Sequence, residues 1–332
     1  MPDIVTQLMT SDDPCIRYRA LVDVRQLAPG DGEAAALREA IRSSARARRL
    51  LAPRDRHGRM PAVYSKYTGA HWVLADLADI GYPPGDASLI PLRDQVYEFW
   101  LDPDRTRERV VDREAARYKS RPGVPVIQGR ARRCASQEGN ALYATLALGL
   151  ADERANQLAA NLIRWQWPDG GWNCDRKAEA HTSSFHESLL PLRGLVWHTK
   201  VTGSRESREA AERAAMFLLE RRLFRRKSSR TVICESFLKL RYPHYWHYDI
   251  LMALKVMVEG GFIDDPRCRD ALDIVQSKQL PDGGWRAEGK HYRVVDIPAN
   301  GGSMADWGPV SRGKVMNPFV TLDALYVLGA RI

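Results

Sequence analysis

The sequence predicts an all-α fold, an α/α toroid in which about six helical hairpins form an inner and an outer ring around a central cavity. First, QWPDGGW at residues 166–172 recurs as QLPDGGW at residues 279–285, 113 residues later. Second, segments that are apolar on almost every side alternate with amphipathic segments, and third, no strand-like alternation of any length interrupts them. An inner ring of buried helices wrapped by an outer ring accounts for the three observations together.

Half of the repeat distance, about 56 residues, defines the unit of the predicted repeat. Steps of this size lead to polar breaks that contain Gly or Ser, at residues 56–61, 118–120 and 226–228. The unit is therefore roughly 45–70 residues long and occurs about five or six times. We expect one domain over residues 1–332, of which residues 1–50 form the N-terminal hairpin.

Two kinds of helix justify the two rings. Residues 140–150 and 250–258 are apolar almost all round, as expected of helices that are buried on every side. Residues 204–223 are amphipathic, and residues 265–278 carry Pro266 near their start and apolar residues on one side. Inner helices are expected at residues 16–27, 69–80, 137–150, 184–198, 245–259 and 318–330. Outer helices are expected at residues 32–48, 88–101, 152–166, 205–224 and 265–278.

Composition limits the class of protein. Among 332 residues, 44% are apolar and 27% are charged, which excludes collagen-like and largely disordered chains. No apolar run approaches the ~18 residues of a membrane span and no secretory signal is visible, so we expect a cytoplasmic protein with peripheral membrane contact left open. Five cysteines without CxxC spacing indicate reduced thiols.

The net charge of +9 indicates either an anionic partner or an ordinary basic surface. No zinc-finger spacing, RNP-like strand or long basic tail supports nucleic-acid binding. We therefore expect a small-molecule partner that is apolar, isoprenoid-like or phosphate-bearing. Four basic residues are candidate anion binders or ordinary surface charges: Lys66, Arg130, Arg132 and Arg133.

The repeated motif also carries a resemblance. Its spacing Q-x3-G-x-W resembles the QW motif of squalene–hopene and oxidosqualene cyclases, and it stands here at Gln166, Gly170 and Trp172, then at Gln279, Gly283 and Trp285. The hairpin repeat is similar to the toroid of protein prenyltransferase β subunits as well, over nearly the whole chain beyond residues 1–50. The resemblance implies that the Trp fills the space between hairpins and the Gln caps them.

The catalytic motifs of these families are not visible in the chain. Squalene-type cyclases carry Asp-x-Asp-Asp, whereas the acidic pairs here are Asp12-Asp13, Asp102-Pro-Asp104 and Asp264-Asp265, expected in loops or at the starts of outer helices. Prenyltransferases bind zinc through Asp-x-Cys and a distant His, and no Asp-x-Cys occurs. The resemblance therefore implies a fold and leaves the chemistry open.

Candidate site residues were sought where inner helices begin, because backbone N–H groups and helix dipoles favour anions there. The densest polar cluster lies at residues 172–187 and contains Glu187. Its possible metal ligands, an alternative to a site without cofactor, are Cys174, Asp175, His181 and His186, for zinc or magnesium. His181 stands where prenyltransferases have a histidine that contacts diphosphate. Arg193 shares a helical face with His186 and is expected to reach an anionic group.

A second cluster at residues 242–249 precedes the most apolar inner helix. The aromatic faces of Tyr245, Trp246 and Tyr248 are expected to line a substrate pocket, because such faces stabilise cations. His247 and Asp249 are expected to act together as a proton donor and its neighbour, unless the segment is an aromatic plug. Two other inner helices add substrate-binding candidates to the same rim, namely His71, Trp72 and Asn140.

The leading hypothesis is a terpenoid-cyclase-like enzyme, an isomerase or lyase, that acts on an isoprenoid or other largely apolar substrate. Cyclisation or isomerisation would begin by protonation, with Asp249 or Glu187 as the acid and His247 or His186 positioning it. One alternative is a metal- or diphosphate-dependent, prenyltransferase-like enzyme that uses His71, His181 and His186. A second alternative is a toroid without catalysis that binds a ligand or serves as a scaffold.

Overall fold

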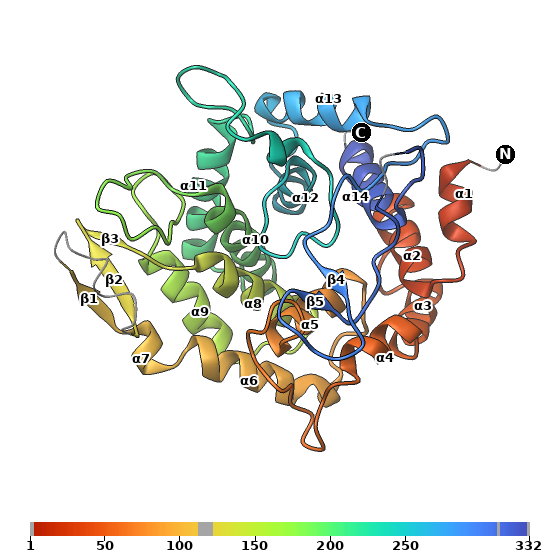
Figure 1. Ribbon diagram of the computed structural model, residues 1–332, viewed down its shortest axis with the longest axis horizontal. Helices are drawn as coiled ribbons and strands as arrows, with labels where there is room; N and C mark the ends of the chain where they lie inside the picture. The colour runs from red at the N-terminus through yellow and green to blue at the C-terminus, as the bar shows by residue number, and fades with distance from the viewer. Residues whose placement is uncertain (1–2, 112–121, 311–312, 331–332) are drawn as a thin grey trace.

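A computed structural model describes residues 3–111, 122–310 and 313–330 and has the predicted all-α architecture (Figure 1). The repeat break expected at residues 118–120 lies outside the described residues. Every described strand is two to four residues long, whereas the longest helix has 18 residues. No helix among the described residues is long and apolar enough to cross a membrane.

Six helical segments of the described chain form the inner ring. They are α2 (Pro14–Arg19) continued by the π-helix η1 (Ala20–Val24), α5 (Ala70–Asp79), α8 (Ala135–Ala147), α10 (Phe185–Thr202), α12 (Ile250–Gly260) and α14 (Pro318–Gly329). Successive members from α5 onward pack against each other, and α14 packs against α2 and η1. The first and last inner helices therefore lie side by side, as Figure 1 shows.

The outer ring consists of amphipathic helices that cover the inner ones. Its members are α1 (Ile4–Met9), α3 (Gly32–Arg42), α4 (Ala45–Leu51), η2 (Ala87–Leu89) with α6 (Ile90–Trp100), α9 (Glu153–Arg164), α11 (Arg205–Leu219) and η5 (Pro266–Cys268) with α13 (Arg269–Ser277). In α9, for example, Ala155, Leu158, Ala159 and Leu162 are buried, at the spacing of one helical face. These bounds agree with the predicted ranges to within a few residues at most ends.

The remaining elements are short and lie in the loops. They are α7 (Pro103–Thr106), η4 (Glu235–Leu238), β1 (Glu108–Val110), β2 (Val124–Ile127), β3 (Arg130–Ala131), β4 (Arg293–Val294) and β5 (Gly302–Ser303). β1 runs parallel to β2, β2 antiparallel to β3, and β4 parallel to β5. Strands this short leave no period-2 signal, which is why the sequence did not predict them.

The two motif tryptophans are buried and make corresponding contacts. Trp172 Nε1 donates to Leu162 O at 2.8 Å, and Trp285 Nε1 donates to Val275 O at 2.7 Å, each near the end of the preceding outer helix. Gln166 Nε2 donates to Ala210 O in α11 at 2.8 Å, so it joins two outer helices. The first copy of the motif thus ties its hairpin to the next outer helix, whereas Gln279 Nε2 of the second copy donates to Gly283 O within the motif itself.

The cavity on the toroid axis is charged, not apolar. It has a volume of about 230 Å³ and is lined by residues from the middle and the C-terminal parts of the inner helices, which include Arg19, Asp79, Arg193, Lys255 and Glu259. Arg193 Nη2 lies 2.9 Å from Asp79 Oδ1, and Arg193 Nε lies 2.8 Å from Glu259 Oε2. The expectation that Arg193 binds an anionic ligand beside His186 is therefore wrong, because two carboxylates from other helices already neutralise it.

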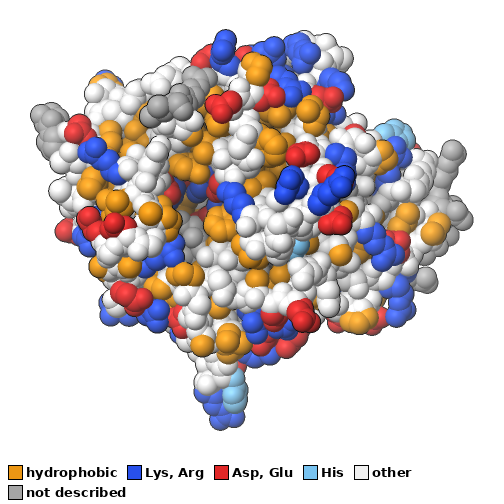
Figure 2. Space-filling view, turned by 180° about the vertical axis from the view of Figure 1, so that it is seen from behind, with side chains coloured by type: hydrophobic (Ala, Val, Ile, Leu, Met, Phe, Trp, Pro, Cys, Tyr) orange, Lys and Arg blue, Asp and Glu red, His pale blue; other side chains and the backbone are white. Residues whose placement is uncertain are grey.

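Figure 2 shows how the charged side chains are distributed on one face of the molecule. On the face behind that of Figure 1, Lys and Arg side chains are interspersed with Asp and Glu (Figure 2).

Candidate functional site

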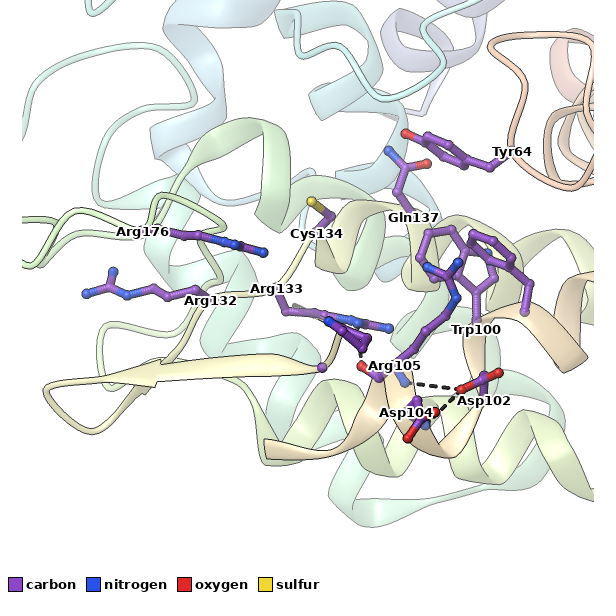
Figure 3. Close-up of a pocket in the computed structure, with 13 residues that line it drawn as sticks. Tyr64, Trp100, Asp102, Asp104, Arg105, Arg132, Arg133, Cys134, Gln137 and Arg176 are labelled. Atoms are coloured by element: carbon purple, nitrogen blue, oxygen red, sulfur yellow. Dashed lines mark hydrogen bonds between the residues drawn. The ribbon is translucent and has the colours of Figure 1, made fainter. Parts of the chain in front are cut away.

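A pocket of about 570 Å³ lies at the rim where the inner helices begin. Its aromatic side consists of Tyr64, Phe99 and Trp100, and its basic side includes Arg132, Arg133 and Arg176, with Cys134 and Gln137 between them (Figure 3). Helix α6, the segment after β3, the start of α8 and the loops that precede α5 and α10 contribute these residues. The pocket therefore offers a ligand an apolar wall and a cationic wall, and the carboxylates of Asp102 and Asp104 line it beside the aromatic residues.

Arg132 is the distinctive residue of the basic side. It is 3% exposed, and its Nη1 donates to Ala180 O at 2.9 Å. Its Nε and Nη2 have no hydrogen-bond partner among the described residues, and no carboxylate there forms an ion pair with it. Burial, followed by the charge of Arg130, lowers the pKa of Arg132. The sequence left Arg132 as either an anion binder or a surface charge. The structure shows a guanidinium that is buried beside a pocket and has two nitrogens without a hydrogen-bond partner in the described part of the chain.

The neighbouring Arg133 has a different environment. Its Nε and Nη2 donate to the Glu138 carboxylate at 3.0 and 2.6 Å, and Glu138 is fully buried. Arg133 is therefore neutralised within the protein. Arg132 and Arg133, adjacent in sequence, differ because only one of them faces a carboxylate.

Three potential metal ligands converge next to the pocket. The Sγ atoms of Cys134 and Cys174 and a carboxylate oxygen of Glu187 all lie within 4.8 Å of one another. Cys174 Sγ donates to Glu187 Oε1 at 3.3 Å, and the Ser136 backbone N–H donates to Glu187 Oε2 at 3.0 Å. Burial raises the pKa of Glu187. Hydrogen bonding with Cys134, then burial, raises the pKa of the Cys174 thiol. We call these three residues the thiol–carboxylate cluster.

Close packing of α8 on α10 brings this cluster together. A Cβ atom on Gly139 would lie 2.3 Å from Pro191 N, and one on Gly194 would lie 2.5 Å from Gly139 O. Only glycine fits at such an approach of two backbones. The start of α8, which carries Cys134, is thereby held against the first turn of α10, which carries Glu187.

The metal ligands expected from sequence are not brought together. Cys174 meets Cys134 and Glu187, whereas Asp175 and His181 are exposed. His186 Nδ1 accepts a hydrogen bond from the Tyr248 backbone N–H at 3.0 Å instead of facing the thiol. In the described ranges, the thiol–carboxylate cluster is the only group of three such ligands. The alternative set of Cys174, Asp175, His181 and His186 is therefore wrong except for Cys174.

The aromatic cluster before α12 forms a stack. The His247 ring lies 3.4 Å from that of His291 and 4.0 Å from that of Trp246, and Tyr245 stacks on Tyr67 at 3.7 Å. Burial, then the charge of His291, lowers the pKa of His247 to about 3. An imidazole of this kind is neutral near pH 7 and has no proton to donate as a cation.

Asp249 caps a helix and does not pair with His247. Its Oδ1 accepts a hydrogen bond from Met252 N at 3.0 Å at the N-cap of α12, and the nearest imidazole, that of His244, lies 3.3 Å away. His247 Nε2 instead contacts Tyr67 Oη at 3.2 Å. The expected pair of His247 and Asp249 is therefore not formed, because the carboxylate serves the backbone of its own helix.

The other candidates are core residues. His71 is fully buried; its Nδ1 accepts from Trp100 Nε1 at 3.3 Å, and its Nε2 lies 3.3 Å from Asn140 Nδ2. Trp72 is also fully buried, and Tyr248 Oη donates to Leu223 O. Through Trp100, His71 supports the aromatic wall of the pocket from behind.

Sequence reasoning missed Cys134, Tyr64 and Trp100. Cys134 directly precedes an apolar helix, the same position that drew attention to candidate residues in the other repeats, so this signal was available. No such signal was present for Tyr64 and Trp100, because an aromatic residue in a loop or on an outer helix most often contributes to the core.

Comparisons with known proteins add a coarse likeness. No protein-family model matches the chain, and no curated protein matches it. Among solved structures, the chain is similar to the type II terpene cyclase MstE from Scytonema (apo), with 15% identity over 85% of this chain and 95% of that chain and a TM-score of 0.28. A variant of that cyclase in complex with geranylgeranyl dihydroxybenzoate gives 15% identity, 85% and 94% coverage, and a TM-score of 0.26. A sequence identity and a TM-score this low do not indicate the function of this chain.

Proposed function

We propose that the chain is an enzyme that acts on a small molecule in which an apolar, isoprenoid-like body is joined to an anionic group. The rim pocket, at about 570 Å³, has the size of typical ligand sites of ~300–1,000 Å³. The observation that carries the proposal is Arg132, a buried guanidinium beside this pocket with two nitrogens that have no partner in the described part of the chain. A buried cation of this kind is costly unless an anion reaches it.

The opposite wall suits the apolar part of such a substrate. Tyr64 and Trp100 lie 5.8 Å apart, ring centre to ring centre, in an edge-to-face arrangement, and both line the pocket. Aromatic faces attract cations through their quadrupole and also bind apolar groups. An isoprenoid diphosphate combines the anionic group and the apolar body that these two walls would recognise.

The proposed reaction is prenyltransferase-like. The diphosphate leaves with the electron pair of its carbon–oxygen bond, and Arg132 stabilises the negative charge that it gains. The rings of Tyr64 and Trp100 stabilise the remaining allylic cation. The nucleophilic atom of an acceptor molecule then forms the new bond to carbon, and the proton that it loses passes to the released diphosphate. The substrate class follows from the pocket walls, and the acceptor is left unassigned.

A second candidate function follows from Glu187. Burial raises the pKa of this carboxyl group, so it keeps a proton to higher pH than an exposed glutamate. Its carboxylate lies within 4.8 Å of the thiol of Cys134, which lines the rim pocket, and this placement together with the raised pKa supports an acid-initiated cyclisation or isomerisation. The product of such a reaction keeps both the mass of the substrate and its anionic group. His186 and His247 are less suited as acids, because burial lowers the pKa of both.

Calorimetric titration with farnesyl diphosphate and with farnesol, its neutral counterpart, tests the substrate class. We expect the diphosphate to bind more tightly, and Arg132→Met to weaken its binding by about 10- to 100-fold, as for a lost hydrogen-bonded charge. Arg208→Met, on the exposed face of α11, removes the same charge and should leave binding unchanged. Equal binding of farnesol, or no effect of Arg132→Met, would show that the pocket does not select an anion.

Product analysis by mass spectrometry then separates the two reactions. Release of diphosphate in the presence of acceptor supports the transfer reaction, whereas a product with the mass of the substrate supports the acid-initiated one. Binding without turnover supports the ligand-binding toroid.

A further inference from the structure

The thiol–carboxylate cluster has the spacing of a metal site. Two ligands bound tetrahedrally at about 2.3 Å from one zinc ion lie about 3.8 Å apart. Cys174 Sγ and Glu187 Oε1 are 3.3 Å apart, and all three ligand atoms lie within 4.8 Å of one another. Shifts on the order of 1 Å would therefore place the three atoms around one ion.

The three side chains repel one another when they are deprotonated, and a bound cation would compensate their negative charge. Each is anionic when it loses its proton, and Glu187 is 7% exposed. A divalent cation in place of the protons would turn this mutual repulsion into coordination. Two soft thiolates favour zinc over magnesium, which prefers oxygen ligands.

The carboxylate is already oriented for such a role. The Ser136 backbone N–H donates to Glu187 Oε2 at 3.0 Å, which leaves Oε1 directed at the Cys174 thiol. Partners of this kind orient metal ligands and raise metal affinity. The close contact of Gly139 with α10 fixes the two helices from which Ser136 and Glu187 come.

One side of the cluster faces the rim pocket. Cys134 lines that pocket and is exposed, whereas Glu187 is buried behind it. Gln137 lines the pocket too; it is 4% exposed, and its Oε1 has no hydrogen-bond partner among the residues described. We infer that Cys134, Cys174 and Glu187 bind a zinc ion through three protein ligands, with a fourth position open toward the pocket. The metal site does not depend on the proposed function. Only contact between a substrate and the open fourth coordination position rests on that function.

Metal analysis of the full chain, purified with a phosphine reductant and zinc in the buffer, tests the inference. We expect one zinc ion per chain by mass spectrometry. After removal of zinc with a chelator, Co²⁺ alone should give intense thiolate-to-cobalt absorption and a tetrahedral d–d spectrum. Cys134→Ser and Cys174→Ser should each weaken Zn²⁺ binding at least about 100-fold in chelator competition.

Cys234→Ser is the matched control, because Cys234 is an exposed thiol whose contact is Ser236. It should retain the zinc and the cobalt spectrum, and circular dichroism should show that all variants stay folded. A zinc content well below one per chain, or a cobalt spectrum without thiolate bands, would overturn the inference. Zinc retained in both Cys134→Ser and Cys174→Ser would overturn it as well. These readouts contain no isoprenoid, so failure of the metal site is distinguishable from failure of the proposed substrate.

Discussion

Arg19 on the first inner helix donates from Nη2 to Asp323 Oδ1 on the last inner helix at 2.6 Å. Lys255 Nζ of α12 lies 2.9 Å from the same oxygen, and both the Arg19 and Asp323 side chains are almost fully buried. One carboxylate therefore joins the beginning and the end of the described ring to its fifth helix. Its loss would leave the buried Lys255 without its carboxylate partner, and Arg19 would keep only its ion pair with Asp23.

We predict that Asp323→Asn lowers the free energy of unfolding by about 3–5 kcal/mol, as for a buried pair that loses one partner. Urea denaturation measures the change. The control is Asp296→Asn, which breaks an exposed ion pair with Arg49 and should have little effect. Equal effects of the two substitutions would mean that the interior network does not hold the ring closed.

The motif tryptophans supply the second prediction. Trp172→Ala and Trp285→Ala should each lower the free energy of unfolding by about 3–5 kcal/mol, because each removes a buried aromatic side chain. Trp172→Phe keeps one aromatic ring but loses part of the buried indole and the hydrogen bond to Leu162 O, so it should cost less than Trp172→Ala and more than the ~1 kcal/mol of the hydrogen bond alone. Thermal and urea unfolding measure both effects. If Trp172→Ala kept full stability and lost only activity, the structural role of the motif would be refuted.

The helices could be predicted from sequence because their signals are local. The apolar character of residues 250–258, for example, follows from neighbours within two turns, and α12 is found there. Ion pairs are not local in this way: Arg193 meets Asp79 and Glu259, which belong to different repeats. Sequence spacing placed Arg193 near His186 and could not reveal carboxylates that arrive from elsewhere in the ring.

The site was only partly predictable for the same reason. Glu187 and Cys174 were singled out as polar residues near the start of an inner helix, but their third partner, Cys134, lies 40 positions before Cys174 and approaches through helix packing. Asp249 shows the opposite difficulty. An acidic residue directly before an apolar helix is what an N-cap requires, and this local role takes up the carboxylate that was expected to act as an acid.

The third prediction concerns Asp249. Asn is as good an N-cap as Asp, so Asp249→Asn should leave stability nearly unchanged, while Asp249→Ala should lower it by about 0.5–2 kcal/mol. Urea denaturation compares the two variants. Turnover should survive in Asp249→Asn, since the side chain is engaged with Met252 N. Loss of turnover in Asp249→Asn with full stability would instead restore Asp249 as the catalytic acid.

The fourth prediction concerns acid stability. Burial lowers the pKa of His71 to about 3 in the folded protein, whereas an unfolded histidine titrates near pH 6.5. As the pH falls from about 6.5 toward 3, the imidazole binds a proton in the unfolded chain but not in the folded protein. The free energy of unfolding therefore falls by up to about 1.4 kcal/mol per pH unit. His71→Gln can keep contacts with Trp100 and Asn140 and should flatten this slope in urea unfolding from pH 7 to pH 4. His57→Gln, at an exposed position, should not, and an unchanged slope in His71→Gln would contradict the prediction.

The last prediction uses Glu187→Gln to read the thiol–carboxylate cluster through stability alone. Because burial raises the pKa of Glu187, the unfolded chain loses this proton first as the pH rises, and the folded protein must then hold a buried anion. The contribution of the Glu187 carboxyl group to stability is therefore greatest below about pH 4.3, its pKa in the unfolded chain. The contribution is lost as the pH rises through the higher pKa of this group in the folded protein. Without metal, Glu187→Gln should be more stable than the wild type at pH 7 and should depend less on pH.

Zinc should reverse that order. A ligand at 100 times its Kd stabilises the folded state by about 2.7 kcal/mol, and the wild type should gain this while Glu187→Gln, with one ligand fewer, should gain much less. Differential scanning calorimetry at pH 7 with chelator and then with Zn²⁺ measures both comparisons. A variant that is less stable under both conditions would show that the carboxylate acts only as an acceptor for Ser136 N and Cys174 Sγ. A variant that is more stable under both would exclude metal binding by Glu187 and leave it free to act as the proton donor.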